Sequence, residues 1–191
     1  MTANFRSLMG ALCLTPFFWV MSVDTVDAQT PVTYTDGGNA IFHISMPDFW
    51  EMRSGGIRVL EPDGPESGRA TNRIMGFSPT ADESAFLALV SPVDVRTLEE
   101  GQEYLANVGR FLVEDVTVTE TKKRRIAGLP SIQFDGTGSR EGRSVAFTAL
   151  VIDLPNGRVA VAVAVAVVEA GVTAAEINDL NAMFASIRPA R

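Results

Sequence analysis

The sequence predicts an α+β domain, in which two main helices pack on an antiparallel sheet of about six or more strands. Segments in which apolar and polar residues alternate recur along the chain, as they do in half-buried strands. Two other segments repeat their apolar residues every three to four positions, which is typical of amphipathic helices. The sequence Pro155-Asn156-Gly157 is a tight-turn signal between two of the strand-like segments, and it favours an antiparallel hairpin there.

Four strands are predicted in the first part of the domain. Residues 40–46 alternate, with Phe42, Ile44 and Met46 on one face, and Pro47 ends the strand. Shorter strand-like segments follow at residues 57–60, 73–77 and 85–91. Residues 61–68 between the first two of these are rich in Pro, Asp, Glu and Gly, and they predict a loop.

The first helix is predicted after these strands. Thr97 and Glu100 have the spacing of a capping box, in which the hydroxyl and the carboxylate satisfy free backbone amides at the start of a helix. The apolar stripe that follows consists of Leu98, Leu105, Val108 and Leu112, supported by Tyr104 and Phe111. This segment therefore predicts an amphipathic helix.

Four further strands are predicted at residues 116–121, 131–137, 144–152 and 158–168. In the last of them valine occupies every odd position from 159 to 167 and alanine every even position from 160 to 166. Neither face is polar, so we expect both to be covered. The alanine face leaves room for a helix to approach closely.

The second helix is predicted at the end of the chain. Thr173 and Glu176 form another capping box. The apolar stripe of this helix is Ile177, Leu180, Phe184 and Ile187. We expect this stripe to pack on the alanine face of the preceding strand.

Residues 1–28 have the organisation of a secretory signal peptide. Arg6 supplies a basic end, an apolar stretch follows at residues 8–21, and small residues precede an expected cut after Ala28. The apolar stretch contains Pro16 and has about 14 residues, fewer than the roughly 20 that a transmembrane helix needs. We therefore expect cleavage, a mature form that is not transmembrane, and export to the periplasm of a bacterium.

The expected mature chain consists of a flexible N-terminus at residues 29–39 and a single α+β domain at residues 40–191. The only cysteine, Cys13, lies in the signal segment, so neither a disulfide nor a thiolate metal site is expected in the domain. The chain has a formal net charge of −7, which argues against nonspecific binding to nucleic acid.

Residues that could carry catalysis or hold a cofactor are few. His43 is the only histidine, so a serine triad or a zinc site would have to include it, and a structural role is the favoured interpretation. The Gly-rich residues 136–142 place Glu141 where a dinucleotide-binding loop needs its third glycine, and they join two predicted strands. A hairpin turn explains them better. We expect no catalytic residue, metal or cofactor.

Two features remain as candidate binding residues. The basic run, which we define as Lys122, Lys123, Arg124 and Arg125, contrasts with an otherwise acidic chain. It is interpreted either as a charged strand end that discourages pairing between sheet edges or as a docking patch for an acidic partner or anionic lipid. Trp50 is interpreted either as core or lid packing or as a residue at the mouth of a ligand cavity.

The order of these elements resembles the PsbP-like superfamily. The segments that carry the resemblance are residues 42–50, with a strand followed by proline and tryptophan, residues 127–131 and residues 184–188. The resemblance implies an α/β/α sandwich around an antiparallel sheet. It also implies a function that comes from docking to other proteins, with no shared catalytic residues to transfer.

The sequence therefore favours a non-enzymatic, exported module for protein interaction or assembly, with a protein partner that belongs to a membrane-associated complex. The alternative is a carrier of a small ligand or lipid, with an apolar cavity beneath the helices and Trp50 near its mouth. A hydrolase that uses His43 is the least favoured hypothesis.

Overall fold

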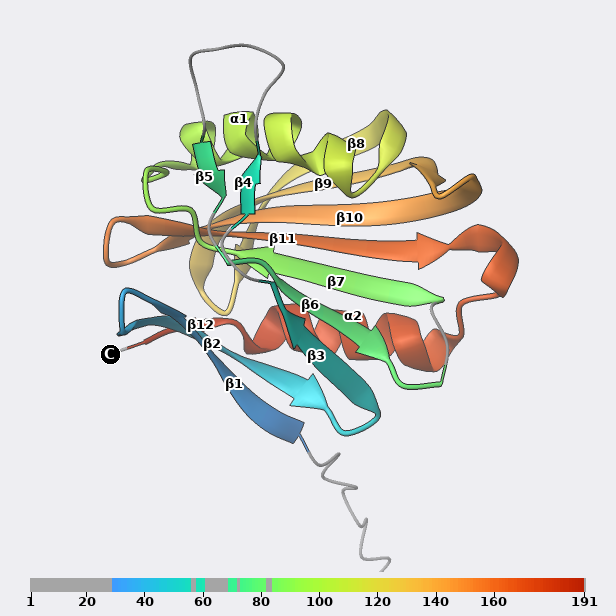
Figure 1. The fold of residues 1–191 in the computed structure, drawn as a ribbon, viewed down its shortest axis with the longest axis horizontal. Helices are drawn as coiled ribbons and strands as arrows, with labels where there is room; N and C mark the ends of the chain where they lie inside the picture. Colours follow the sequence, from blue (N-terminus) through green and yellow to red (C-terminus); the bar gives the residue numbers. More distant parts are fainter. Residues whose placement is uncertain (1–28, 56–57, 61–68, 72, 82–83, 191) are drawn as a thin grey trace, which may run out of the picture.

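A seven-stranded antiparallel sheet forms the centre of the fold (Figure 1). The computed structural model describes residues 29–55, 58–60, 69–71, 73–81 and 84–190, so the expected signal segment and the loop at residues 61–68 lie outside the described residues. In spatial order the strands of the sheet are β3 (Trp50–Ser54), β6 (Met75–Pro79), β7 (Ala85–Val90), β11 (Arg158–Val167), β10 (Arg143–Leu154), β9 (Leu129–Arg140) and β8 (Glu114–Ile126).

Two smaller sheets and the helices complete the described fold. The three-stranded sheet consists of β1 (Gln29–Asp36), β2 (Asn39–Pro47) and β12 (Arg188–Pro189), and the two-stranded sheet of β4 (Arg58–Leu60) and β5 (Arg69–Thr71). The helices are α1 (Leu98–Val108), with the 3-10 turn η1 (Gly109–Phe111), and α2 (Ala174–Ser186), preceded by the 3-10 turn η2 (Val168–Ala170). The predicted α+β class is therefore confirmed, and none of the described helices is long and apolar enough to cross a membrane.

The prediction of a flexible N-terminus at residues 29–39 is wrong for its first eight residues, which form β1. β1 pairs antiparallel with β2, and the ring of Tyr34 stacks on that of Phe42 with 4.9 Å between the centroids. Gly37 and Gly38 have φ of 55° and 84°, which only glycine adopts easily, and they make the turn. The Gly-Gly turn was the hairpin signal that could have identified β1.

Both faces of β11 are buried, as the Val/Ala alternation predicted. The alanine face belongs to the cluster that contains Leu180, Met183 and Phe184 of α2, while the valines belong to two clusters on the α1 side. One residue of the expected α2 stripe was misplaced: Ile177 is 48% exposed, and Met183 is fully buried instead. The physical reason is that the buried face of α2 is rotated from Ile177 towards Met183.

Both predicted capping boxes are present. At the start of α1 the amide of Glu100 donates to Oγ1 of Thr97 over 3.1 Å, and at the start of α2 the amide of Glu176 donates to Oγ1 of Thr173 over 3.2 Å. Gly101 of α1 faces the sheet so closely that an added Cβ would overlap Cγ1 of Val151. A glycine inside this helix therefore serves close packing of α1 on the sheet.

The predicted hairpins are confirmed. β10 and β11 pair up to Leu154 and Arg158, so residues 155–157 form the turn between them. The β9–β10 turn consists of Glu141 and Gly142, with φ of 53° and 76°. The glycine-rich segment at residues 136–142 is thus the end of a strand and a hairpin turn.

A polar contact joins the small sheet to the large one. Nη1 of Arg158 in β11 lies 3.1 Å from Oδ2 of Asp36 in β1, and Nη2 of Arg158 donates to the carbonyl oxygen of Ser91 over 2.7 Å. The hydroxyl of Tyr34 donates to the carbonyl oxygen of Arg73 over 3.0 Å. These bonds fix β1 against the ends of β7 and β11.

Candidate functional site

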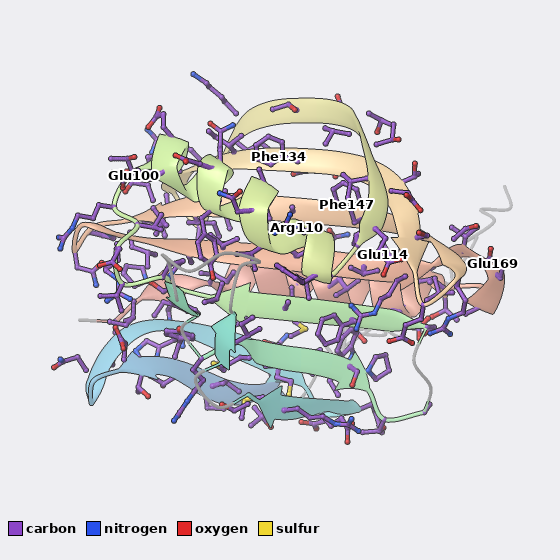
Figure 2. All side chains as sticks on the ribbon, turned by 45° about the horizontal axis from the view of Figure 1, so that its top comes forward. Glu100, Arg110, Glu114, Phe134, Phe147 and Glu169 are labelled. Atoms are coloured by element: carbon purple, nitrogen blue, oxygen red, sulfur yellow. The ribbon has the colours of Figure 1, made fainter. Side chains whose placement is uncertain are left out.

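The basic run lies on β8, the edge strand of the seven-stranded sheet. β8 is 13 residues long, and all of its side chains except that of Ile126 are exposed. In Figure 2 this strand curves along the outer side of β9 at the top of the molecule. One backbone edge of β8 is paired with β9, and an edge strand presents unpaired amide and carbonyl groups on its other side.

The register of β8 on β9 places the four cations on both faces of the sheet. Lys122 and Arg124 pair with Gln133 and Ser131 of β9. These two β9 residues pair in turn with β10 residues that belong to the cluster on the α2 side of the sheet. Lys123, in contrast, pairs with Ile132. Since neighbouring side chains of a strand point to opposite faces, Lys123 and Arg125 lie on the α1 side. The basic run is therefore two pairs of cations around one strand edge, and no single flat surface includes all four.

Short contacts orient three of these side chains. Nζ of Lys122 lies 2.5 Å from Oε2 of Glu120, a neighbour on the same strand face. Arg124 donates to Oε1 of Gln133 over 2.6 Å, and Arg125 donates to the carbonyl oxygen of Gly128 over 2.7 Å. All of these contacts are exposed, so the charges remain accessible to a partner.

Only the second half of β8 is regular. The register shifts between Glu114 and Thr117 and again between Val118 and Glu120, as it does at β-bulges. From Glu120 onwards every residue of β8 has a successive partner on β9. Residues 120–126 are thus the part of the edge that a further strand could extend.

Trp50 lies in the core. It is 3% exposed, and its Nε1 donates to Oδ2 of Asp179 in α2 over 2.9 Å. The neighbouring Phe49 is 82% exposed. The interpretation of Trp50 as core packing fits this position, and its interpretation as a ligand-mouth residue stays a prediction.

His43 lies on β2, where its Nδ1 is 2.8 Å from Oγ1 of Thr33 on β1. This bond links the two strands of the small sheet and gives His43 a structural role. Among the residues that the structure describes, no three His, Cys, Asp or Glu side chains gather in a way that could hold a metal ion.

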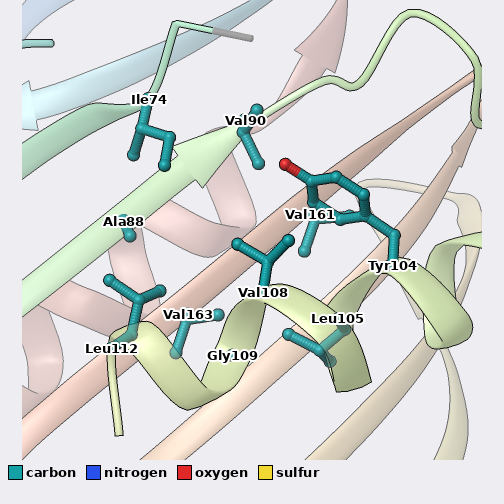
Figure 3. Close-up of a pocket in the computed structure, with 10 residues that line it drawn as sticks. All are labelled: Ile74, Ala88, Val90, Tyr104, Leu105, Val108, Gly109, Leu112, Val161 and Val163. Carbon is teal, nitrogen blue, oxygen red and sulfur yellow. The ribbon is translucent and has the colours of Figure 1, made fainter. Parts of the chain in front are cut away.

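An apolar cavity lies between α1 and the sheet (Figure 3). It is lined by side chains of α1 and η1, among them Leu105 and Val108, and by residues of β7 and β11. Its volume is about 20 Å³, enough for one water molecule and far below the size of a ligand pocket. The cavity beneath α1 is therefore too small for a lipid chain.

Tyr104 borders this cavity with its hydroxyl pointing towards Val90 (Figure 3). The buried hydroxyl oxygen finds no hydrogen-bond partner within the described part of the chain. Burial, with a smaller contribution from Tyr34, raises the pKa of Tyr104 to about 12. The group is therefore neutral at physiological pH and has no role as a base there.

No family model matches the chain, and no curated protein does. Among solved structures it is similar to LpqN, which is involved in cell envelope biogenesis of Mycobacterium tuberculosis, with 19% identity, a TM-score of 0.50, and coverage of 86% of this chain and 91% of LpqN. A second is protein PA94 of unknown function from Pseudomonas aeruginosa, a putative regulator, with 12% identity, a TM-score of 0.44, and coverage of 84% and 98%. A third is cyanobacterial PsbP from Synechocystis, with 12% identity, a TM-score of 0.48, and coverage of 90% and 99%.

The likeness to LpqN supports the predicted α+β sandwich fold. At 19% identity a shared fold does not transfer an activity, a partner or a binding residue. The function has to be inferred from the surface of this chain.

Proposed function

We propose that this chain is an exported, non-enzymatic accessory module that binds an acidic, extended segment of a partner protein along residues 120–126 of β8. The observation that carries the proposal is the distribution of the basic run over both faces of a regular strand edge that pairs with no further strand of the described residues. The proposed binding mode is strand addition, in which backbone hydrogen bonds supply affinity and alternate side chains supply specificity.

Strand addition makes use of both pairs of cations. The side chains of an added strand alternate between the two faces of the sheet, so an acidic segment places carboxylates beside Lys122 and Arg124 on one face and beside Lys123 and Arg125 on the other. Opposite charges on neighbouring strands each contribute roughly 0.2–1 kcal/mol. A flat lipid surface would meet one pair at a time, which is why a protein segment is favoured over anionic lipid.

A second copy of the chain is a poor partner for the same edge. Antiparallel pairing of two β8 strands centred on Lys123 would place cation opposite cation, which is destabilising. Pairing of two β8 strands centred closer to Glu114 would involve the irregular part of the strand, where its register with β9 shifts twice. The basic run therefore discourages self-association, as its first interpretation held, and at the same time selects an acidic partner.

Export is part of the proposal. The pattern of residues 1–28 is that of a signal peptide, with cleavage after Ala28 and residues 29–191 as the mature protein. LpqN, a solved structure of similar fold, is involved in cell envelope biogenesis. We place the chain in the periplasm, where it would support a membrane-associated complex.

The proposal is tested by replacing all four residues of the basic run by serine and recovering partners from periplasm by crosslinking. A matched control removes four exposed arginines elsewhere, Arg73, Arg96, Arg110 and Arg188, and so changes the net charge equally. We expect the partner to be lost with the basic-run variant and retained with the control. Recovery of the same partners with both variants would show that the basic run of β8 does not bind them.

A second pair of variants separates strand addition from docking on one face. Lys122→Ser with Arg124→Ser removes the cations of one face, and Lys123→Ser with Arg125→Ser removes those of the other. Strand addition predicts that both double variants weaken binding of the recovered partner, each by about tenfold if two charge pairs are lost. If one double variant abolishes binding and the other has no effect, the partner docks on one face.

A further inference from the structure

A second hollow lies on the α1 side of the seven-stranded sheet, at the end away from the Pro155-Asn156-Gly157 turn. It has a volume of about 170 Å³ and is lined by Arg53, Arg140 and Arg143, with Ser78 among them. The residues beneath these polar groups include Phe86 and Val165. The hollow is therefore a cationic rim above an apolar floor, and it is separate from the edge formed by residues 120–126 of β8.

The pairing of the strands brings the three arginines to one face. Arg140 and Arg143 are partners at the end of the β9–β10 hairpin, and side chains of directly paired residues lie on the same face. Arg53 of β3 pairs with Gly76 of β6, which pairs in turn with Ala88 of β7. Ala88 pairs in turn with Val163 of β11, which belongs to the valine cluster on the α1 side, so Arg53 also lies on that side.

One of the arginines is fixed by its surroundings. Cζ of Arg140 lies 5.0 Å from the centre of the Phe86 ring, and its Nη1 donates to the carbonyl oxygen of Leu112 over 3.0 Å. Gly76 leaves the space for that ring, because an added Cβ would lie 2.9 Å from Cε2 of Phe86. A guanidinium has five N–H donors, so orientation by one carbonyl and one ring leaves donors to meet a ligand.

The other two arginines are exposed, and each lies near a carboxylate. The side chain of Arg143 is 40% exposed, and its Nη2 lies 3.9 Å from Glu141, the one carboxylate among the described residues that line the hollow. The side chain of Arg53 is 78% exposed and contacts Glu51 over 2.6 Å. Three guanidinium groups around one small space, in a chain with a net charge of −7, make a local site for an anion.

We propose that this hollow binds a phosphate group that carries a small apolar substituent. A phosphate dianion accepts from more than one guanidinium, and arginine matches its geometry with paired N–H donors. The apolar substituent would lie on Phe86 and Val165. A volume of about 170 Å³ is below that of a drug-sized pocket, so the ligand is of the size of a phosphoryl headgroup.

The test uses the mature protein and isothermal titration with phenyl phosphate, inorganic phosphate and benzyl alcohol. We expect saturable binding of phenyl phosphate that is tighter than that of inorganic phosphate, and none of benzyl alcohol. Arg53→Gln and Arg143→Gln should each raise the Kd about tenfold, because charge-assisted hydrogen bonds contribute that much. Both side chains are exposed, so these variants keep the core intact.

Arg96→Gln is the matched control, since Arg96 is exposed and lies outside the hollow. An equal loss of affinity in this control would overturn the proposal, because binding would then follow net charge alone. Vesicles of phosphatidylglycerol, with phosphatidylcholine as reference, identify the source of the phosphate. Arginine-dependent binding to the anionic vesicles would point to a lipid headgroup, and arginine-dependent binding of phenyl phosphate alone to a free compound. Failure of both to bind would reject the site.

Discussion

The indole Nε1 of Trp50 donates a hydrogen bond to Oδ2 of Asp179 over 2.9 Å and so joins the start of β3 to the middle of α2. The two residues are 129 positions apart in the chain. Trp50 is 3% exposed, so this bond satisfies a donor that is otherwise shielded from water.

Replacement of Trp50 by phenylalanine should lower the free energy of unfolding by about 2 kcal/mol, because it removes the donor and part of the buried ring. The measurement is urea unfolding followed by circular dichroism. Asp179→Asn is the milder comparison, since the amide retains an acceptor oxygen, and it should cost about 1 kcal/mol or less. An unchanged unfolding midpoint for Trp50→Phe would show that the bond does not stabilise the fold.

Gly101→Ala should destabilise the protein by about 1–3 kcal/mol, although alanine is the better helix former. The cause is the overlap of the added Cβ with Val151, which forces α1 away from the sheet. Gly109→Ala is the matched control: its φ is −56°, and an added Cβ would meet Leu105 at an ordinary 3.8 Å. Thermal unfolding should show the control unchanged or stabilised, and equal effects at both positions would contradict the packing explanation.

Tyr104→Phe should raise the stability at neutral pH by about 1 kcal/mol, because the buried hydroxyl has no partner within the described part of the chain. The pKa of Tyr104 is raised by burial from 10.0 to about 12, so the folded state holds this proton more tightly than the unfolded state. Stability is therefore complete below pH 10 and falls as the pH rises towards 12.

Urea unfolding at several alkaline pH values tests whether the stability falls as the pH rises above 10. The Tyr104→Phe variant should lose less stability above pH 10 than the parent. Some dependence should remain, because burial also raises the pKa of Tyr34. A variant with the parent's full alkaline slope would show that Tyr104 does not titrate as its burial implies.

Asparagine at two turn positions should stabilise the fold. Comparison of the two variants distinguishes an effect on the stability of the turn from an effect on ligand binding. Glu141 and Ala127 each precede a glycine in a two-residue hairpin turn, with φ of 53° and 47°. Asn tolerates positive φ better than Glu or Ala, so each replacement should add about 0.5–1 kcal/mol, measured by thermal unfolding.

Only Glu141→Asn should also tighten the binding of phenyl phosphate, by about threefold, because it removes the carboxylate that lines the hollow of the arginines. Ala127→Asn lies at the other end of β9 and should leave that affinity as it is. Tightening in both variants would indicate a general effect of stability, and tightening in neither would count against the proposed position of the phosphate.

Local patterns in the sequence determined much of this fold. The capping boxes of Thr97 and Thr173 and the Val/Ala strand all depend on residues within a few positions of one another, and the structure places them as predicted. β1 was missed because its few apolar residues lie among Thr and Pro, so that apart from the Gly-Gly turn its own sequence does not mark it as a strand, and its pairing with β2 does. The arginine-lined hollow had no local signal, because Arg53 and Arg140 are far apart in the chain.

The basic run shows most clearly which features depend on the sequence alone and which depend on the tertiary structure. The sequence alone determined that four cations follow one another directly after a strand predicted at residues 116–121, and the structure extends that strand to Ile126. Only the tertiary structure decided that this strand is the outermost one and which cations belong to which face, since both depend on the register with β9. The order of strands in a sheet is set by long-range hydrogen bonding and packing, whereas alternation, caps and turns are set by near neighbours.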